Sequence, residues 1–478
     1  MSATKQAAQA LIIREELGSS NVFWLDMGVL WEVAVTEICQ GEPSAEIRQG
    51  CLYLGRFTRN LVAGVPQNQE KSSAFEPAFR RILIKTTSFF MMQDTEWNSI
   101  TTALVQALSN IATDNEPIRS AIWPLYIDLK EQENIVLRSL ASPDTRTVIA
   151  TSVLMLNCVQ GDPQNILQLV TKPRGIQICR AVLDRVNNHV EQSEEEESED
   201  ETFAIFFRLF QAIFNSQAFP RLWTSLTNYE EPITQHQTIL LKLLDSYLQS
   251  ALCATKSTDL GLISPLVNIH LELSDAARTA LGGSDGPSPS AESRLTVDPR
   301  LPVLTKALVL TSQCIISLLL FEQENKLVLR DLGIAKEARS KNGMSLVDEG
   351  VDLLRRLDIL LPRIILGREQ HASNLNTLGT ATAADDSRRP AGFEYIKRDL
   401  VRLLGILCHE DREIQDSVRE RGGIPLIMNM CVIDERNPYL REHALFTLKN
   451  LLQDNPENKK LVDDIKPLDR WEAEGRLV

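Results

Sequence analysis

The sequence predicts an all-α protein, an armadillo-like helical-repeat solenoid, and three observations lead to this class. Apolar residues recur at three- and four-residue spacing along most of the 478 residues, whereas the alternating pattern of strands is scarce. A short phrase recurs at intervals of 44 to 50 residues. The hydrophobic fraction of 43% suits a chain that buries a long core, and stacked repeats are not limited in length by one spherical core.

In the N-terminal part, the phrase is a helical run containing asparagine followed by a polar turn. It occurs three times: Asn60 before Pro66, Asn110 before Pro117, and Asn157 before Pro163. The asparagines are 50 and 47 residues apart, close to the roughly 40 to 47 residues of armadillo and HEAT repeats. The period therefore predicts a stack of helical repeats.

Two further copies of the phrase lie near the C-terminus, at Leu404 and Leu448, which are 44 residues apart. Apolar residues at helical spacing predict one amphipathic helix over 396–407 and another over 444–452, with Leu448 on the buried stripe. The polar run after each helix stops it and caps the next, and Pro456 is tolerated in a first turn, where its missing N–H costs nothing.

A second break in the C-terminal repeat indicates how many helices it contains. Gly422, Gly423 and Pro425 interrupt the chain before the apolar run 426–431. Each repeat then has three helices, which favours the armadillo type over HEAT.

Composition divides the predicted solenoid into segments. Residues 1–190 are expected to form N-terminal armadillo-like repeats, and 191–202 an acidic linker whose like charges repel one another. Residues 203–390 are expected to form middle helical repeats, with disordered insertions near 282–300 and 371–391, where Gly, Pro, Ser and Thr accumulate. Residues 391–478 are expected to form C-terminal armadillo repeats.

The C-terminal segment resembles the ataxin-10 family. The resemblance rests on several motifs in order: Val401-Arg402-Leu403-Leu404-Gly405-Ile406-Leu407-Cys408, Gly423-Ile424-Pro425-Leu426-Ile427, Asn437-Pro438-Tyr439-Leu440-Arg441-Glu442-His443-Ala444 and Lys449-Asn450-Leu451. It implies an intracellular armadillo-like scaffold without an active site, linked to cytokinesis and cell survival. One departure is Ile406, where the phrase more often has Asn.

Motifs that would carry chemistry are missing from the sequence. It contains no phosphate-binding loop, no dinucleotide fingerprint, no nucleophile elbow and no His-Glu-x-x-His zinc motif. Cys408, His409 and Glu410 are adjacent, but neighbouring helical side chains point about 100° apart and do not converge on one ion. We therefore predict no catalytic, cofactor-binding or metal-binding residues, and hence no enzyme.

Charge and hydropathy narrow the partners and the compartment. The net charge of -14 disfavours nucleic acid. The most apolar window, 301–321, is interrupted by Lys306 and Gln313, so it predicts a buried helix and no membrane insertion. The start of the chain lacks the pattern of a secretion signal, and the eight scattered cysteines form no framework, which indicates core thiols in a cytoplasmic protein.

The asparagines at the phrase position have two interpretations. In armadillo proteins, an asparagine on the third helix of successive repeats can bind the backbone of an extended peptide, which makes Asn60, Asn110, Asn157 and Asn450 candidate partner-binding residues. Alternatively, each asparagine caps the end of its own helix. The six tryptophans show no matching register that would strengthen the peptide interpretation.

We therefore expect a non-enzymatic scaffold that binds other proteins, with self-association as a further option. The family resemblance implies a role in regulation of cytokinesis and cell survival. The alternative is a transport adaptor that captures basic peptide signals in an acidic groove, which the net charge permits. A cluster of titratable groups in a deep pocket would instead point to an enzyme.

The acidic segment also carries two candidate phosphorylation sites, Ser193 and Ser198, each followed by a glutamate three residues later. A phosphate would add about -1.5 to -2 charges at each serine. The other interpretation is a plain solvated tether.

Shortening residues 194–201 to a few Gly and Ser residues should leave the melting temperature nearly unchanged, because loop-closure entropy changes by only about 0.6 kcal/mol per doubling of length. Thermal unfolding of the two chains checks this. If the segment acts electrostatically, its loss should slow association with a basic partner, and added salt should shrink that deficit. Unfolding of the shortened chain would contradict the expectation.

Overall fold

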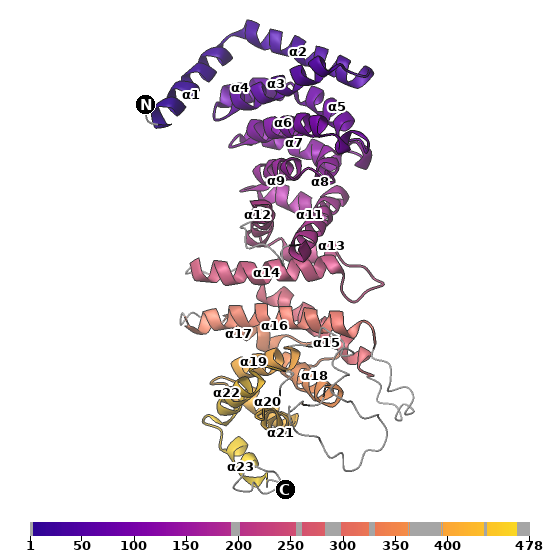
Figure 1. Cartoon of the computed structure of the whole chain (residues 1–478). Coiled ribbons are helices and arrows are strands. Elements are labelled where there is room, and N and C mark those ends of the chain that lie inside the picture. The colour runs from indigo at the N-terminus through magenta and orange to yellow at the C-terminus, as the bar shows by residue number, and fades with distance from the viewer. Residues whose placement is uncertain are drawn as a thin grey trace. The chain divides into compact units, whose positions relative to one another are not determined.

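The computed structural model describes residues 3–192, 201–254, 261–282, 298–324, 330–361, 395–434 and 437–465, together with residues 363 and 393. Throughout these ranges the regular elements are helices, and Arg339 and Ser345 form an isolated β-bridge (Figure 1). The predicted all-α, armadillo-like fold class is confirmed. The chain forms two compact units, Met1–Leu226 and Thr227–Val478, and each is described by itself.

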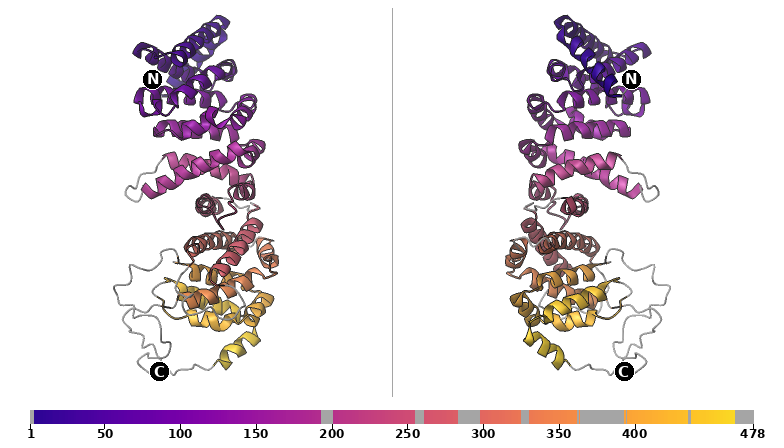
Figure 2. Two further views of the ribbon diagram at one scale, coloured as in Figure 1. Left: turned by 90° about the vertical axis from the view of Figure 1, so that its right-hand side faces the viewer. Right: turned by 90° about the vertical axis from the view of Figure 1, so that its left-hand side faces the viewer.

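The first unit is a succession of stacked helices. The phrase-bearing helices α3, α6 and α9 pack on one another in order, and α12 packs on α9. In a second row, α2, α5, α8 and α11 are in successive contact. Figure 2 shows the stacked helices of this unit from two further sides. The helices of this unit are α1 (Ala3–Ser19), α2 (Asn21–Gln40), α3 (Ala45–Val62), α4 (Pro66–Ser73), α5 (Glu76–Thr86), α6 (Thr95–Ala112), α7 (Glu116–Asp128), α8 (Ile135–Leu140), α9 (Thr145–Val159), α10 (Pro163–Thr171), α11 (Pro173–Gln192), α12 (Glu201–Asn215) and α13 (Phe219–Ser225).

The second unit repeats the same stacking. The long helix α16 packs against α14, α15 and α19, and α22 packs on α19. Its helices are α14 (Gln235–Ala254), α15 (Ile263–Ala280), α16 (Leu301–Glu324), α17 (Arg330–Glu337), α18 (Leu346–Leu360), α19 (Ile396–Leu407), α20 (Arg412–Glu420), α21 (Gly423–Met430), α22 (Leu440–Leu452) and α23 (Pro456–Asp464).

The phrase ends one helix and begins the next in the same way each time. The phrase position is the position of the repeated asparagine, which Ile406 occupies in one copy. Four residues after it, the backbone is in the left-handed region, at Gly64, Asp114, Gly161, Glu410 and Asp454. The next residue is the N-cap of the following helix, and in four of the five copies its side chain accepts a backbone N–H: Asn115, Asp162, Asp411 and Asn455. The predicted stop-and-cap role of the polar run is confirmed at these copies.

The apolar helix α16 is a core helix of the second unit. By length and composition its residues 301–323 could cross a membrane, with a mean hydropathy of 1.9 over the best window. However, 61% of that window is buried inside the structure. Leu304, Leu308, Ile315 and Leu319 are among the buried residues, and they face the helices packed around α16. The buried helix predicted over this window is therefore present.

The described cysteines are free thiols, as the sequence predicts. The thiols of Cys51, Cys158, Cys179, Cys314 and Cys408 are free and buried, those of Cys39 and Cys431 are free and half-buried, and the Cys253 side chain lies outside the described residues. Residues 193–200, 283–297 and 364–392 also lie outside them, so the acidic linker and the insertions stay predictions.

The predicted register of α22 was wrong. Ala444 and Leu451 are buried, but Leu448 is only half-buried and Leu445 is 47% exposed. The polar Thr447 occupies the position against α19, where its Oγ1 donates to the Val401 carbonyl oxygen at 2.9 Å. The leucine stripe is therefore rotated away from the core.

Close packing at this junction explains why a polar residue replaces leucine there. A Cβ placed on Gly405 of α19 would lie 2.5 Å from Thr447 Oγ1, so the two helices approach one another at a glycine. A leucine at position 447 would not fit against α19, whereas a threonine fits and satisfies its own hydroxyl.

Replacing Leu451 with Ala should destabilise the second unit by about 2 to 5 kcal/mol, because a fully buried side chain would leave a cavity. The matched change Leu445→Ala on the exposed side of α22 should cost about 0.5 kcal/mol or less. Urea denaturation followed by circular dichroism measures both. Equal losses for the two variants would show that the register of α22 described above is incorrect.

Candidate functional site

The repeated asparagines join each phrase helix to the preceding one. Asn110 Nδ2 donates to the Arg59 carbonyl oxygen at 3.0 Å, and Asn450 Nδ2 donates to the Gly405 carbonyl oxygen at 2.8 Å. Asn157 Nδ2 lies 3.2 Å from the Ser109 carbonyl oxygen. In all three copies the acceptor is the residue just before the phrase position of the preceding repeat.

A second set of hydrogen bonds runs in the opposite direction. The last carbonyls of a helix have no partner within it, so they need outside donors. Gln69 Nε2 donates to the carbonyl oxygens of Asn110 and Thr113 at 2.8 and 3.0 Å. Arg119 reaches the Asn157 carbonyl at 3.3 Å, and Gln415 Nε2 reaches the Asn450 carbonyl at 3.0 Å. Each repeat therefore supplies donors to the end of the next phrase helix.

Asn60 differs from the other three asparagines. It is exposed, and its Oδ1 accepts a hydrogen bond from the Nε of the adjacent Arg59 at 3.1 Å. Asn110, Asn157 and Asn450 thus have a junction role: each donates a hydrogen bond from its own helix to the preceding phrase helix. This role differs from both interpretations of the sequence, which were a contact with a bound peptide and a cap on the same helix. The recurrence of Asn at one phase of the repeat is the signal that could have indicated it. The peptide-binding role stays a prediction, and Ser193 and Ser198 lie outside the described residues.

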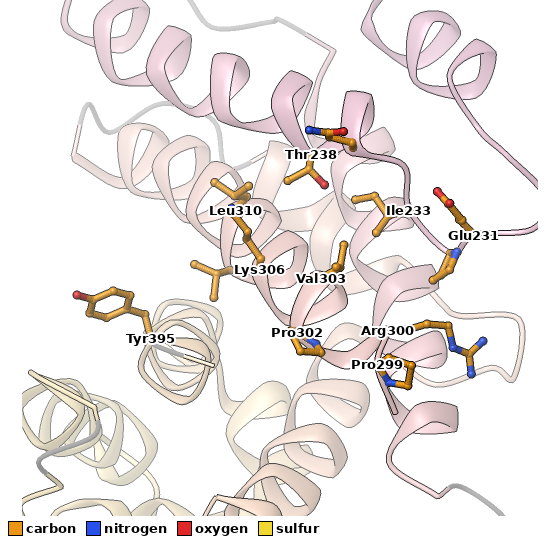
Figure 3. A pocket seen from close by; sticks show the side chains of 13 residues that line it. Glu231, Ile233, Thr238, Pro299, Arg300, Pro302, Val303, Lys306, Leu310 and Tyr395 are labelled. Carbon is orange, nitrogen blue, oxygen red and sulfur yellow. The ribbon is translucent and has the colours of Figure 1, made fainter. Parts of the chain in front are cut away.

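The second unit contains an open groove of about 1120 Å³. It lies between the start of α14, the N-terminal half of α16 and the residue that precedes α19 (Figure 3). Tyr395 lies at one end, and Glu231 and Arg300 lie at the other. Its lining is mostly apolar and comprises Glu231, Pro232, Ile233, Gln235, Thr238, Pro299, Arg300, Pro302, Val303, Lys306, Val309, Leu310 and Tyr395.

The charged residues at the Tyr395 end form a connected set. The Arg398 guanidinium lies 4.3 Å from the centre of the Tyr395 ring and pairs with the buried Asp399 at 2.6 Å. Asp399 also accepts a hydrogen bond from Gln313 Nε2 of α16 at 3.0 Å. Lys306 is exposed in the groove and has no ion-pair partner among the described residues. Among the described residues at this end, Lys306 is therefore an exposed charge that no carboxylate compensates.

Two titratable groups near this set have shifted pKa values. Burial raises the pKa of the Asp245 carboxyl group on α14, and the nearby Asp399 carboxylate raises it further. Burial lowers the pKa of His443 on α22, and the positive charges of Arg402 and Arg398 lower it further. The two groups lie on different helices, α14 and α22.

In the part of the chain that the structure describes, no three His, Cys, Asp or Glu side chains come together to hold a metal ion. Cys408 is buried, and burial raises the pKa of its thiol, with Asp411 adding to the shift. The arrangement of helices and groove defines an armadillo-like helical-repeat protein with an open groove in its second unit.

Comparison with known proteins identifies the family of the C-terminal domain. Residues 396–474 match the family model described as the spinocerebellar ataxia type 10 protein domain. The chain is 26% identical to Ataxin-10 of Homo sapiens over 375 residues, covering 77% of this chain and 66% of that protein. It is 23% identical to Ataxin-10 of Xenopus tropicalis over 372 residues, covering 75% of this chain and 62% of that protein.

One relative is more similar over a short stretch of the chain. An Ataxin-10 homolog of Dictyostelium discoideum is 44% identical over 70 residues, which cover 15% of this chain and 12% of the relative. The resemblance to the ataxin-10 family is confirmed, and residues 396–474 of the chain match the domain model of that family. It spans a little under two thirds of the length of the first curated relatives it matches.

Solved structures share only a loose likeness with this chain. SYS-1 is 10% identical, covers 92% of this chain and 87% of its own, and has a TM-score of 0.33. A structure concerning the interaction between cadherin and beta-catenin is 13% identical, covers 88% of this chain and 98% of its own, and has a TM-score of 0.22. The fold assignment rests on the helices described above.

Replacing Asn157 with Leu should destabilise the first unit by about 1 to 3 kcal/mol, because the acceptors on α6 would lose their donor. The matched change Asn60→Leu should cost about 0.5 kcal/mol or less, because Asn60 makes no such bond to a preceding phrase helix. Urea denaturation of both variants measures the difference. Equal costs would refute the junction role.

Proposed function

We propose that the chain is a non-enzymatic, armadillo-like scaffold that binds protein partners through the groove of the second unit. The groove supports this function because it is open and mostly apolar, and it presents large side chains that solvent reaches. Val303 is 45% exposed and Tyr395 is 41% exposed. Apolar surface of this kind, bordered by charged residues, is typical of protein interaction sites.

The cellular role that we propose rests on family resemblance. Similarity to Ataxin-10 supports a cytoplasmic scaffold that takes part in regulation of cytokinesis and cell survival. Self-association remains part of this proposal.

The alternative function is a transport adaptor that takes basic peptide signals. The net charge of -14 favours it, because an acidic protein attracts basic segments over long distances. At the groove itself, the exposed Lys306 disfavours it, since a basic peptide would bring like charges together. The scaffold is therefore the better supported of the two.

Replacing Val303 with Glu should reduce partner recovery in affinity capture from cells by about fivefold or more, because a charge would enter the apolar lining. Ile359→Glu is the matched control, since Ile359 is 80% exposed on α18 of the same unit and does not line the groove. Quantitative mass spectrometry compares the two variants with the unaltered chain.

Both variants should keep the melting temperature of the unaltered chain, because both replaced side chains are already partly or largely exposed. An identical partner set for Val303→Glu and the unaltered chain would show that the groove is not the binding surface.

A further inference from the structure

Two tyrosines occupy the same position in consecutive repeats of the second unit. Tyr395 directly precedes α19 and Tyr439 directly precedes α22, 44 residues later. Both have left-handed backbones, with φ of 70° and 65°. Glycine or asparagine adopts this conformation readily, whereas a bulky aromatic residue is strained in it. The same strained residue, a tyrosine with a left-handed backbone, therefore occurs at the equivalent position of two repeats.

Neither tyrosine side chain is buried in the core, so burial does not offset the backbone strain. Tyr395 is 41% exposed and Tyr439 is 69% exposed. Residues kept in strained conformations cluster at functional sites, where the surrounding structure holds them in place. Because the rings contribute little burial, we look for their role at the protein surface.

Basic side chains lie near the helices that follow the two tyrosines and in the groove. The Arg398 guanidinium lies over the Tyr395 ring, and Lys306 of α16 lines the same groove as that ring. Arg402 follows Arg398 by one helical turn and has no hydrogen-bond or ion-pair partner among the described residues. His443 follows Tyr439 by one turn and lies close enough to Arg398 and Arg402 for their charges to act on it.

Among the described residues, the anions of this region leave Lys306 and Arg402 without an ion-pair partner. Asp399 is fully buried and is satisfied by Arg398 and Gln313. Glu231 lies at the far end of the groove from Tyr395 (Figure 3). Asp245 of α14 lies near Asp399 and accepts a hydrogen bond from Gln249, and Glu442 acts on His443 from α22. Neither carboxylate forms an ion pair with Lys306 or Arg402 among the described residues, so these two cations stay available to a ligand.

We propose that Tyr395 and Tyr439, together with Lys306 and Arg402, form a recognition surface for an acidic peptide segment of a partner protein that carries a large apolar side chain. The inference rests on the proposed scaffold function and specifies the chemistry of the partner. Carboxylates of the segment pair with Lys306 and Arg402, and its apolar side chain packs between a tyrosine ring and the apolar lining of the groove.

The charge of the whole chain makes such a surface selective. At a net charge of -14, most of the chain repels an acidic segment, so binding concentrates where cations are uncompensated. A basic segment would be attracted to many places and would be repelled at this one. Complementary charge thus distinguishes this proposal from capture of basic signals.

The test uses three fluorescein-labelled 15-residue peptides and the full chain. The first alternates Glu and Asp with Phe and Leu, the second replaces the acidic residues with Lys, and the third keeps the acidic residues but replaces Phe and Leu with Ser. Fluorescence anisotropy should show the tightest binding for the first peptide, and that binding should weaken as salt rises. Equal binding of the Lys peptide or of the Ser peptide would overturn the proposal.

Variants locate the binding on the surface. Arg402→Glu should weaken binding of the acidic apolar peptide about tenfold, whereas the charge reversal Lys460→Glu on the exposed part of α23 should leave it nearly unchanged. Equal effects of the two reversals would indicate a general charge effect and would overturn the assignment of this surface.

The double variant Tyr395→Gly with Tyr439→Gly separates binding from stability. Glycine relieves the backbone strain, so the melting temperature should stay the same or rise while peptide binding falls about tenfold. A structural role would give the opposite result, with a lower melting temperature and retained binding. Tyr395→Asn with Tyr439→Asn is the second pair, because asparagine also tolerates the left-handed backbone.

The two proposals fail in different ways. If Val303→Glu loses cellular partners but the acidic apolar peptide shows no preference over the Lys peptide, the scaffold function stands and this inference is wrong. If Val303→Glu retains all its partners, the groove is not the scaffold's binding surface, whatever the peptides do.

Discussion

The carbonyl groups at the ends of the phrase helices are the constraint on which the stack depends. These carbonyl oxygens have no donor within their own helix, and the neighbouring repeat covers them. Gln69, Arg119 and Gln415 donate to them from the preceding repeat, while Asn110, Asn157 and Asn450 donate back to the preceding helix. In a solenoid each repeat contacts only its neighbours, so these reciprocal bonds fix the register of successive helices.

Much of this organisation could be read from the sequence, because it depends on local chemistry. The period, the helix ends and the N-caps at Asp162 and Asn455 follow from residues a few positions apart. The hydrogen-bond partner of each asparagine cannot be read in this way, because it depends on the rotation of one helix relative to the next. The misplaced Leu448 has the same origin: leucine content suggested one face of α22, and the close approach at Gly405 selected another.

The groove was beyond sequence reasoning for a different reason. Its lining comes from residues near 231, 303 and 395, and only the stacking of α14, α16 and α19 brings them together. One signal was nevertheless present. Tyr395 and Tyr439 are separated by 44 residues, the same interval that separates the two C-terminal phrases, so the repeat alone places them at equivalent positions. Their left-handed backbones could be seen only in the structure.

The junction bonds and the proposed recognition surface are connected through α19 and α22. Asn450 holds the end of α22 to the Gly405 carbonyl, and Thr447 holds its middle to the Val401 carbonyl. With these two helices clamped together, Tyr395, Arg402 and Tyr439 keep a fixed arrangement before any partner arrives. A surface that is already ordered loses less conformational entropy on binding than one that must fold around its ligand. The bonds that stack the repeats therefore also prepare the surface that we assign to recognition.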